Sequence, residues 1–329
     1  MKAVVCPKYG PPEVLQFKEI EKPIPKDNEV LIKIFATTVN AADARIRGAV
    51  FPSMFNIPVR LFLGIRGPRK KILGVELAGE IETVGKNISR FKEGDQIFAS
   101  TGADMSAHAE YVCLPENAEV AIKPTNMTYE EAAAVPHCAL AALFFLNKGN
   151  IHNGQKILIY GASGGIGTFA VQIAKSLGAE VTGVCSTANI QMVKSLGADN
   201  VIDYTKKDLN QINGTYDIIF DTIGKSPISA CGRALNKNGL YMLAVHMDLP
   251  RIIEGMKVSR KNKIKIIAGV AAYSVENLNY LKDLIESGKM KTVIDKNYTF
   301  EQIIEAHEYV DTGHKKGHVV ITMNPITKS

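Results

Sequence analysis

The chain has 329 residues, of which 46% are apolar and 22% charged, and its formal net charge is +6 at pH 7. At roughly 150 residues per domain, this length predicts about two domains, each large enough to bury its own core. The basic clusters at 66–71 and 257–265 contain no aromatic residues, so they indicate solvated loops and no nucleic-acid partner. Five widely spaced cysteines without a C-x-x-C pair predict reduced thiols and argue against a structural zinc site.

The sequence also shows no signal for a membrane or for secretion. Its first ten residues turn polar too early for a secretory signal. The longest apolar run, 132–146, is shorter than the roughly 18 residues that a membrane span requires. We therefore expect a cytoplasmic protein with no membrane partner.

The first 123 residues are predicted to form a β-rich domain. Short β-type runs at 29–38, 76–84 and 109–114 are separated by Gly, Pro and Asn, which is the pattern of strands joined by turns. The segment 51–71, with several prolines and glycines, is expected to be a loop.

The pattern changes near residue 125. A capping box of Thr128 and Glu131 begins an Ala-rich helix. Apolar strands then alternate with helices, and strands that are apolar throughout are typical of a parallel sheet covered on both faces. The strands are expected at 156–160, 180–185, 200–203, 217–220 and 239–245, followed by helices near 274–287 and 300–312 and a last strand at 318–323.

A glycine turn, Gly161-Ala-Ser163-Gly164-Gly165-Ile166-Gly167, follows the first of these strands and begins a helix. In this context one glycine permits the tight turn, one lets the backbone approach a diphosphate, and one lets helix and strand pack closely. The diphosphate would sit at the helix N-terminus, where free N–H groups favour negative charge. A turn without a ligand is the alternative.

The end of the second strand bears on the choice of dinucleotide. An NAD site usually has Asp or Glu there, about 20 residues after the glycine motif. The segment 185–189 contains no acid, but Ser186 and Thr187 could hydrogen-bond a 2′-phosphate. We therefore expect NADPH to be favoured over NADH. The alternative role for these two hydroxyls is capping of the next helix.

Residues spread over most of 1–240 match one family pattern. The run 154–167, with Gln172 and Lys175 after it, matches that pattern almost position for position. The other matches, in chain order, are Val39, Asn40, Asp43, Gly74, Glu76, Ala78, Gly79, Gly94, Asp95, Ala109, Glu110, Tyr111, Ala132, Pro136, Leu196, Asp199, Asp203 and Tyr204.

On these residues the chain resembles zinc-independent medium-chain dehydrogenases/reductases of the quinone oxidoreductase/zeta-crystallin type. Short-chain dehydrogenases are excluded, because no tyrosine has a lysine four residues later. The resemblance implies an α/β protein with two domains and suggests a homodimer. A Rossmann domain with a doubly wound parallel sheet, 124–289, would be inserted into a GroES-like β-rich substrate domain, 1–123 plus about 290–329.

The resemblance also implies that no zinc is bound. Zinc-dependent relatives have a cysteine near the position of Asn40 and a histidine at the position of Val75. Cys138 lies about where a third ligand would be, and one thiol cannot complete a site of three protein ligands. We interpret Cys138 as a small core residue.

The same resemblance assigns residues to the cofactor. Gly161, Ser163, Gly164, Gly165 and Ile166 are expected along the diphosphate, and Ser186, Thr187 and Tyr204 around the adenosine phosphate. Asn40 is expected near the nicotinamide, and Ala244 and Val245, after the sixth strand, would flank it. Ala188 and Asn189 depart from the pattern, since relatives often have a basic residue there.

These assignments predict hydride transfer from NAD(P)H to a quinone or an α,β-unsaturated carbonyl without metal, with a small-molecule electrophile as the partner. An enoyl-thioester reductase, whose carrier would face 66–71, and a non-enzymatic NAD(P)H sensor or structural protein are the alternatives; a zinc alcohol dehydrogenase is disfavoured. No catalytic acid is assigned. Asn40 could bind the substrate or hold its own turn, Asp43 is expected to anchor a helix, and His137 and His246 are packed histidines or proton relays.

Overall fold

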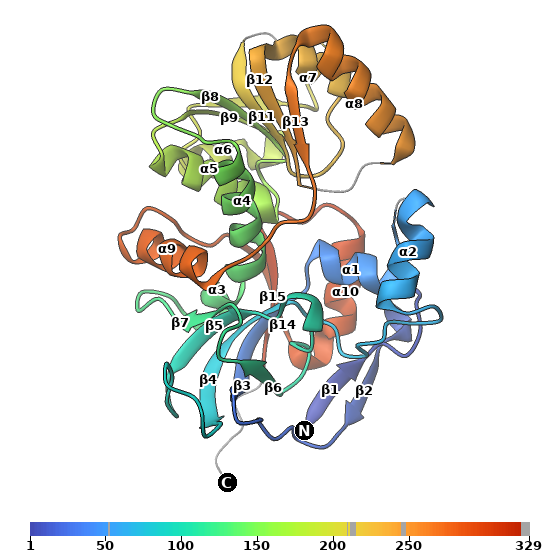
Figure 1. Ribbon diagram of the computed structural model, residues 1–329, viewed down its shortest axis with the longest axis vertical. Helices are drawn as coiled ribbons and strands as arrows, with labels where there is room; N and C mark the ends of the chain where they lie inside the picture. The colour runs from blue at the N-terminus through green and yellow to red at the C-terminus, as the bar shows by residue number, and fades with distance from the viewer. Residues whose placement is uncertain (52, 209, 211–214, 245–247, 324–329) are drawn as a thin grey trace. The chain divides into compact units, whose positions relative to one another are not determined.

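A computed structural model describes residues 1–51, 53–208, 210, 215–244 and 248–323 (Figure 1). The chain divides into two compact units. The first comprises Met1–His137, Tyr273–Gly288 and Thr292–Ser329, and the second Cys138–Ala272 and Lys289–Lys291. Within the described ranges, no helix is both long and apolar enough to cross a membrane.

The second unit is built on a six-stranded, fully parallel sheet in the order β10-β9-β8-β11-β12-β13. Counted along the chain, this order is 3-2-1-4-5-6, which confirms the predicted Rossmann fold. The order reverses between β8 and β11, so the topological switch point lies there. The strands are β8 Lys156–Tyr160, β9 Glu180–Cys185, β10 Asn200–Asp203, β11 Tyr216–Asp221, β12 Leu235–Leu243 and β13 Lys265–Ala268.

Helices that precede or connect the strands shield this sheet from water. Ile157, Leu158 and Ile159 of β8 are all fully buried although they alternate between the two sheet faces, so both faces are covered. The described helical elements are α4 Pro136–Lys148, α5 Gly165–Ser176, η3 Thr187–Asn189, α6 Ile190–Ser195, α7 Ile228–Ala234 and α8 Leu249–Asn262.

The first unit contains a sheet in the order β14-β15-β3-β4-β5-β7, with β6 also paired to β3, and the hairpin β1-β2. Its last strand, β15, pairs antiparallel with β3, so the C-terminal segment completes the N-terminal sheet. The strands are β1 Lys2–Val5, β2 Gln16–Glu19, β3 Glu29–Thr38, β4 Glu76–Val84, β5 Gln96–Ser100, β6 Tyr111–Pro115, β7 Val120–Ile122, β14 Ile294–Thr299 and β15 His318–Thr322.

The helices of the first unit correct one expectation. The segment 51–71 is not a loop throughout, because α2 spans Ser53–Leu63. Pro58 lies inside this helix, and no further proline or glycine follows it until Gly64 ends the helix. The helical elements are η1 Pro12–Val14, α1 Ala41–Gly48, α2, η2 Gly102–Asp104, α3 Tyr129–Ala133, α9 Val275–Glu286, η5 Phe300–Gln302 and α10 Ile303–Asp311.

The bounds of the units differ from the expected 124–289. The segment with α9 belongs to the first unit, although its place in the sequence suggested the second. The Thr125 amide donates to Glu286 Oε1 at 3.0 Å, and Asn126 Nδ2 donates to Ile285 O at 2.9 Å. Both contacts join residues about 160 positions apart, which no local sequence pattern can reveal.

Close packing of α5 on β8 requires a glycine at 167. A Cβ there would lie 2.0 Å from Gly161 O, whereas at Gly164 the nearest atom, again Gly161 O, would be 3.4 Å away. We predict that Gly167→Ala lowers the free energy of unfolding by about 1–3 kcal/mol through overpacking. Gly164→Ala is the matched control and should change it little. Denaturant unfolding measures both, and equal stability of the two variants would contradict the prediction.

Candidate functional site

The glycine turn after β8 has the geometry of an anion cradle. Gly161 has φ 82°, a left-handed conformation that glycine adopts without strain. Gly164 is the N-cap of α5 and has no side chain to satisfy the first-turn N–H groups, which begin at Gly165 and Ile166. With Ser163 in the same turn, these residues fit the diphosphate of a dinucleotide.

The loop after β11 is fixed beside this turn. Asp221 lies opposite Tyr160 in the β8–β11 register, so it marks the switch point. Thr222 Oγ1 donates to Tyr160 O at 2.8 Å and also lies 3.3 Å from Gly161 O. The two loops that flank the switch point are therefore tied together where dinucleotides bind in this fold.

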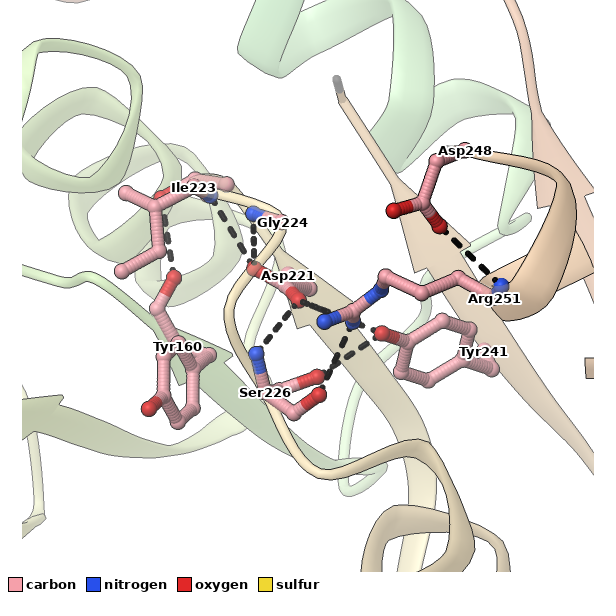
Figure 2. Close-up of polar contacts among 9 residues, drawn as sticks. Tyr160, Asp221, Ile223, Gly224, Ser226, Tyr241, Asp248 and Arg251 are labelled. Atoms are coloured by element: carbon pink, nitrogen blue, oxygen red, sulfur yellow. Dashed lines mark hydrogen bonds and ion pairs between the residues drawn. The ribbon is translucent and has the colours of Figure 1, made fainter. Parts of the chain in front are cut away.

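The Asp221 carboxylate organises the loop that follows it. It is fully buried and accepts hydrogen bonds from the amides of Ile223, Gly224 and Ser226, at 2.7 to 3.0 Å (Figure 2). Three backbone donors on one carboxylate replace the hydration that burial removes. The Asp221 side chain thus binds three backbone amides of the segment 222–226.

Two further side chains close this network. Tyr241 Oη donates to Asp221 Oδ2 at 3.2 Å and lies 2.7 Å from Ser226 Oγ. Arg251 Nη2 donates to Ser226 O at 2.9 Å and lies 3.9 Å from Asp221 Oδ2 (Figure 2). Burial raises the pKa of Tyr241, and the Asp221 charge adds to this, so the phenol stays a donor. Sequence reasoning missed this network; the acid that ends the apolar run 216–221 was its only signal.

The structure brings together the three residues predicted for the adenosine phosphate. The Tyr204 amide donates to Cys185 O at 3.1 Å, so the backbone of this half-exposed residue lies beside the end of β9. Thr187 Oγ1 donates to the Asp203 carboxylate. Ser186 holds the N-cap position of η3 without a capping bond to the described residues, and its Oγ accepts from Asn189 Nδ2 at 3.2 Å.

The position of Asp203 contradicts the expectation that no acid lies near the end of β9. No acid follows β9 in sequence, yet this carboxylate from β10 reaches the same place. The hydrogen bond from Thr187 holds the pKa of Asp203 below its usual range, so the group is negative at neutral pH. The acid-free surroundings expected for a 2′-phosphate are therefore not present.

The predicted nicotinamide neighbours are only partly described. The Ala244 amide donates to Asp221 O at 3.0 Å. Ala244 follows β12, which is the fifth strand of this sheet and not the sixth as expected. Val245 and His246 lie outside the described residues.

In the first unit, Asn40 and Asp43 form a reciprocal cap on α1. Asn40 Oδ1 accepts from the amides of Ala42 and Asp43, and Asp43 Oδ2 accepts from the Asn40 amide at 3.0 Å. Asp43 Oδ1 accepts from the Gly74 amide at 3.1 Å. The prediction that Asp43 anchors a helix is confirmed, and Asn40 holds its own turn.

Glu76, at the start of β4, is the centre of a buried polar cluster. Its Oε1 accepts from Thr38 Oγ1 at 2.5 Å and from Asn40 Nδ2 at 3.4 Å, and its Oε2 accepts from the His137 amide at 2.8 Å. Burial raises the pKa of Glu76 and of Asp43 to about 7. Sequence reasoning gave Glu76 no role, although an acid inside the apolar run 75–79 signals a buried charge.

The residues at the zinc positions do not fit a metal. Val75 has no donor atom, and the Asn40 side-chain oxygen is taken by two backbone amides. Nowhere in the described part of the chain are three His, Cys, Asp or Glu side chains grouped so that they could hold a metal ion.

Comparisons with known proteins agree with this fold. An alcohol dehydrogenase GroES-like domain model matches 26–142, and a zinc-binding dehydrogenase model matches 196–321. The chain is 33% identical to NAD(P)H oxidoreductase RTN4IP1, mitochondrial, of Bos taurus, over 98% of this chain and 89% of that protein. It is 30% identical to the NADPH-dependent alkenal/one oxidoreductase, chloroplastic, of Arabidopsis thaliana, over 98% and 79%.

Among solved structures, the quinone oxidoreductase from Coxiella burnetii superposes with a TM-score of 0.86 at 27% identity, over 98% of this chain and 99% of that one. The chain belongs to the medium-chain dehydrogenase/reductase family. Because Val75 cannot bind a metal, this member falls in the zinc-independent, quinone oxidoreductase-type group.

The diphosphate cradle of this dehydrogenase/reductase can be tested at Gly164, where a side chain is sterically tolerated. Gly164→Asp places a carboxylate at the N-terminus of α5, and like-charge juxtaposition costs several kcal/mol. We expect NADPH to bind at least about 100-fold more weakly, measured by fluorescence titration. Gly164→Ala should retain most of the affinity. Unchanged affinity in the Asp variant would refute the assignment of this turn.

The buried Glu76 predicts a pH dependence of stability. Its pKa is raised from 4.5 to about 7, so its proton stabilises the fold fully below pH 4.5, and this contribution is lost as the pH rises to about 7. Glu76→Gln removes the titration, so its free energy of unfolding should fall less than the wild type's between about pH 5 and about pH 8. Glu80→Gln, on the same strand, should keep the wild-type dependence. Identical pH dependence in wild type and Glu76→Gln would contradict the prediction.

Proposed function

We propose that the protein is an NAD(P)H-dependent oxidoreductase that reduces quinones or α,β-unsaturated carbonyls without metal. The observation that supports this most is the glycine cradle tied to the Asp221 loop at the switch point, in a chain whose zinc positions hold Asn40 and Val75. The relatives named above as an NADPH alkenal/one oxidoreductase and a quinone oxidoreductase point to the same acceptors.

The chain's own residues would bind and orient the reactants. A bound nicotinamide supplies the hydride. The N–H groups at Gly165 and Ile166 would hold the diphosphate, and the Thr222 hydroxyl keeps the loops on both sides of the switch point in register. Positioning of this kind provides several kcal/mol of barrier reduction and suits an electrophile that delocalises the incoming charge.

For the cofactor we propose NADPH in preference to NADH, held by Ser186, Thr187 and Tyr204. The Ser186 hydroxyl and the exposed Tyr204 ring are available for a 2′-phosphate. The Asp203 charge opposes this preference, since it lies against Thr187. We therefore expect a moderate preference.

We further propose that the protein works as a cytoplasmic homodimer on a small-molecule electrophile. Sedimentation equilibrium and cell fractionation test these two points. The relatives named mitochondrial and chloroplastic make fractionation the sharper of the two experiments.

The activity test is oxidation of NADPH and NADH by metal-stripped protein, with 1,4-benzoquinone and an alkenal as acceptors. Turnover with either acceptor, faster with NADPH, is the expected result. Cofactor binding without turnover of either acceptor would contradict the proposal and favour a thioester substrate or a sensor role.

The cofactor preference is tested by the double variant Ser186→Ala and Thr187→Val, which removes both hydroxyls. We expect NADPH affinity to fall about tenfold, because the hydrogen bond from the Ser186 hydroxyl to the charged phosphate is lost, while NADH affinity changes little. Titration of both cofactors measures this. Equal losses for NADPH and NADH would show that these hydroxyls do not bind the phosphate.

A further inference from the structure

We propose that α2 and the basic segment after it bind the surface of an anionic membrane. All the residues concerned lie within the first unit. Such binding is independent of the proposed reduction. A helix that lies on a bilayer surface does not need the length of a spanning segment, on which the expectation of no membrane partner was based.

The outer face of α2 is apolar. Within 57–63, where the burial of this helix is described, the exposed residues are Ile57, Pro58, Leu61 and Phe62, and none of them is polar. Ile57 and Leu61 lie one turn apart on the same face and are 73% and 57% exposed, and Phe62 is 70% exposed. A helix on a protein surface usually directs its polar side to water, and α2 does the reverse.

The opposite side of α2 is packed onto the first unit. Leu63 contacts the core of this unit. The Gly64 amide donates to Arg60 O at 2.8 Å, and Gly64 O accepts from Tyr9 Oη at 2.7 Å. Single exposed apolar residues are common on protein surfaces, but several that gather on one packed helix indicate a binding surface.

Basic side chains border the apolar face. The Arg69 amide donates to Leu63 O at 2.6 Å, and Arg69 Nη2 donates to Leu61 O at 2.8 Å, so the segment after α2 folds back onto its C-terminal end. Ile65 and Arg66, which lie between them in the chain, are both exposed. One guanidinium group therefore lies beside the apolar face, and a second belongs to the same exposed segment.

The positive charge of the chain is concentrated in this region. The 32 residues 44–75 contain seven Lys and Arg and no Asp or Glu, whereas the whole chain has a net charge of only +6, so all other residues together carry −1. Arg47 is buried and paired with Asp311, and Lys70 is paired with Asp104 at 2.8 Å. The other basic residues give the surface around α2 a positive potential.

An exposed apolar helix beside excess positive charge fits an anionic lipid surface. Phe and Leu side chains enter the boundary between headgroups and acyl chains, while Lys and Arg meet the lipid phosphates. In a two-fold dimer built on this face, the same basic residues would face one another and repel. A nucleic acid would neutralise the basic residues but leave the apolar face in water. Of these three partners, only the membrane matches both features.

The experiment measures co-sedimentation of the full chain with phosphatidylcholine vesicles, with and without phosphatidylglycerol. We expect binding to vesicles that contain phosphatidylglycerol and much weaker binding to the others, and a decrease with added salt because salt screens the charges. Leu61→Asn with Phe62→Asn should lower the partition constant at least about tenfold, since polar side chains do not enter the acyl boundary. Ile24→Asn with Val270→Asn, also exposed but outside this face, is the matched control and should bind like wild type.

The contribution of charge is tested by Arg66→Gln with Arg69→Gln. Each basic residue near an anionic surface strengthens binding about fivefold, so this pair of substitutions should lower the partition constant about 25-fold. Lys18→Gln with Lys92→Gln removes the same charge from exposed positions elsewhere in the first unit and should change the constant much less.

Absence of wild-type binding to vesicles with phosphatidylglycerol would overturn the inference, as would equal losses in the variants and their controls. A loss in the charge variant alone would also overturn it and indicate a ligand of charge only, such as a nucleic acid. Dissociation of a wild-type dimer by Leu61→Asn with Phe62→Asn, seen by sedimentation equilibrium, would assign the face to a second copy of the chain instead. The proposed reduction is measured without vesicles, so none of these outcomes affects it.

Discussion

A buried carboxylate needs hydrogen-bond donors in place of the water it loses. In the second unit this requirement determines the conformation of the loop after β11. Asp221 is fully buried and takes three backbone amides and the Tyr241 hydroxyl. Without it, three amides of the loop after β11 would lose their acceptor, and each buried unsatisfied group costs about 1–3 kcal/mol. The carboxylate thus fixes a loop at the switch point, where Thr222 ties it to the glycine turn.

In the first unit the buried carboxyl group of Glu76 likewise needs hydrogen-bond donors. Its two oxygens accept from Thr38, Asn40 and the His137 amide, which come from three separate segments of the chain. Burial raises the pKa of Glu76 and so favours its protonated form. Each unit therefore has one buried acid at the centre of a polar cluster.

Local patterns in the sequence predicted the features that depend on neighbouring residues alone, namely the strands, the helices and the glycine turn. The alternation of apolar strands and helices gave the parallel sheet, and the glycines at 161, 164 and 167 predicted the tight turn and the close packing seen in their conformations. Asp203 could not be foreseen beside Thr187, because their proximity depends on β10 pairing with β9. The same holds for α9, which two hydrogen bonds to 125 and 126 assign to the first unit.

The substitution of valine for a metal-binding histidine changes what the neighbouring acid does. Beside a bound cation, a carboxylate would be stabilised by positive charge. Val75 cannot bind a cation, so only three hydrogen-bond donors stabilise the Glu76 carboxylate, and burial raises its pKa to about 7. One of these donors is the backbone of His137, whose ring contacts Tyr273. In this chain a hydrogen-bonded acid therefore holds Thr38, Asn40 and the His137 backbone together.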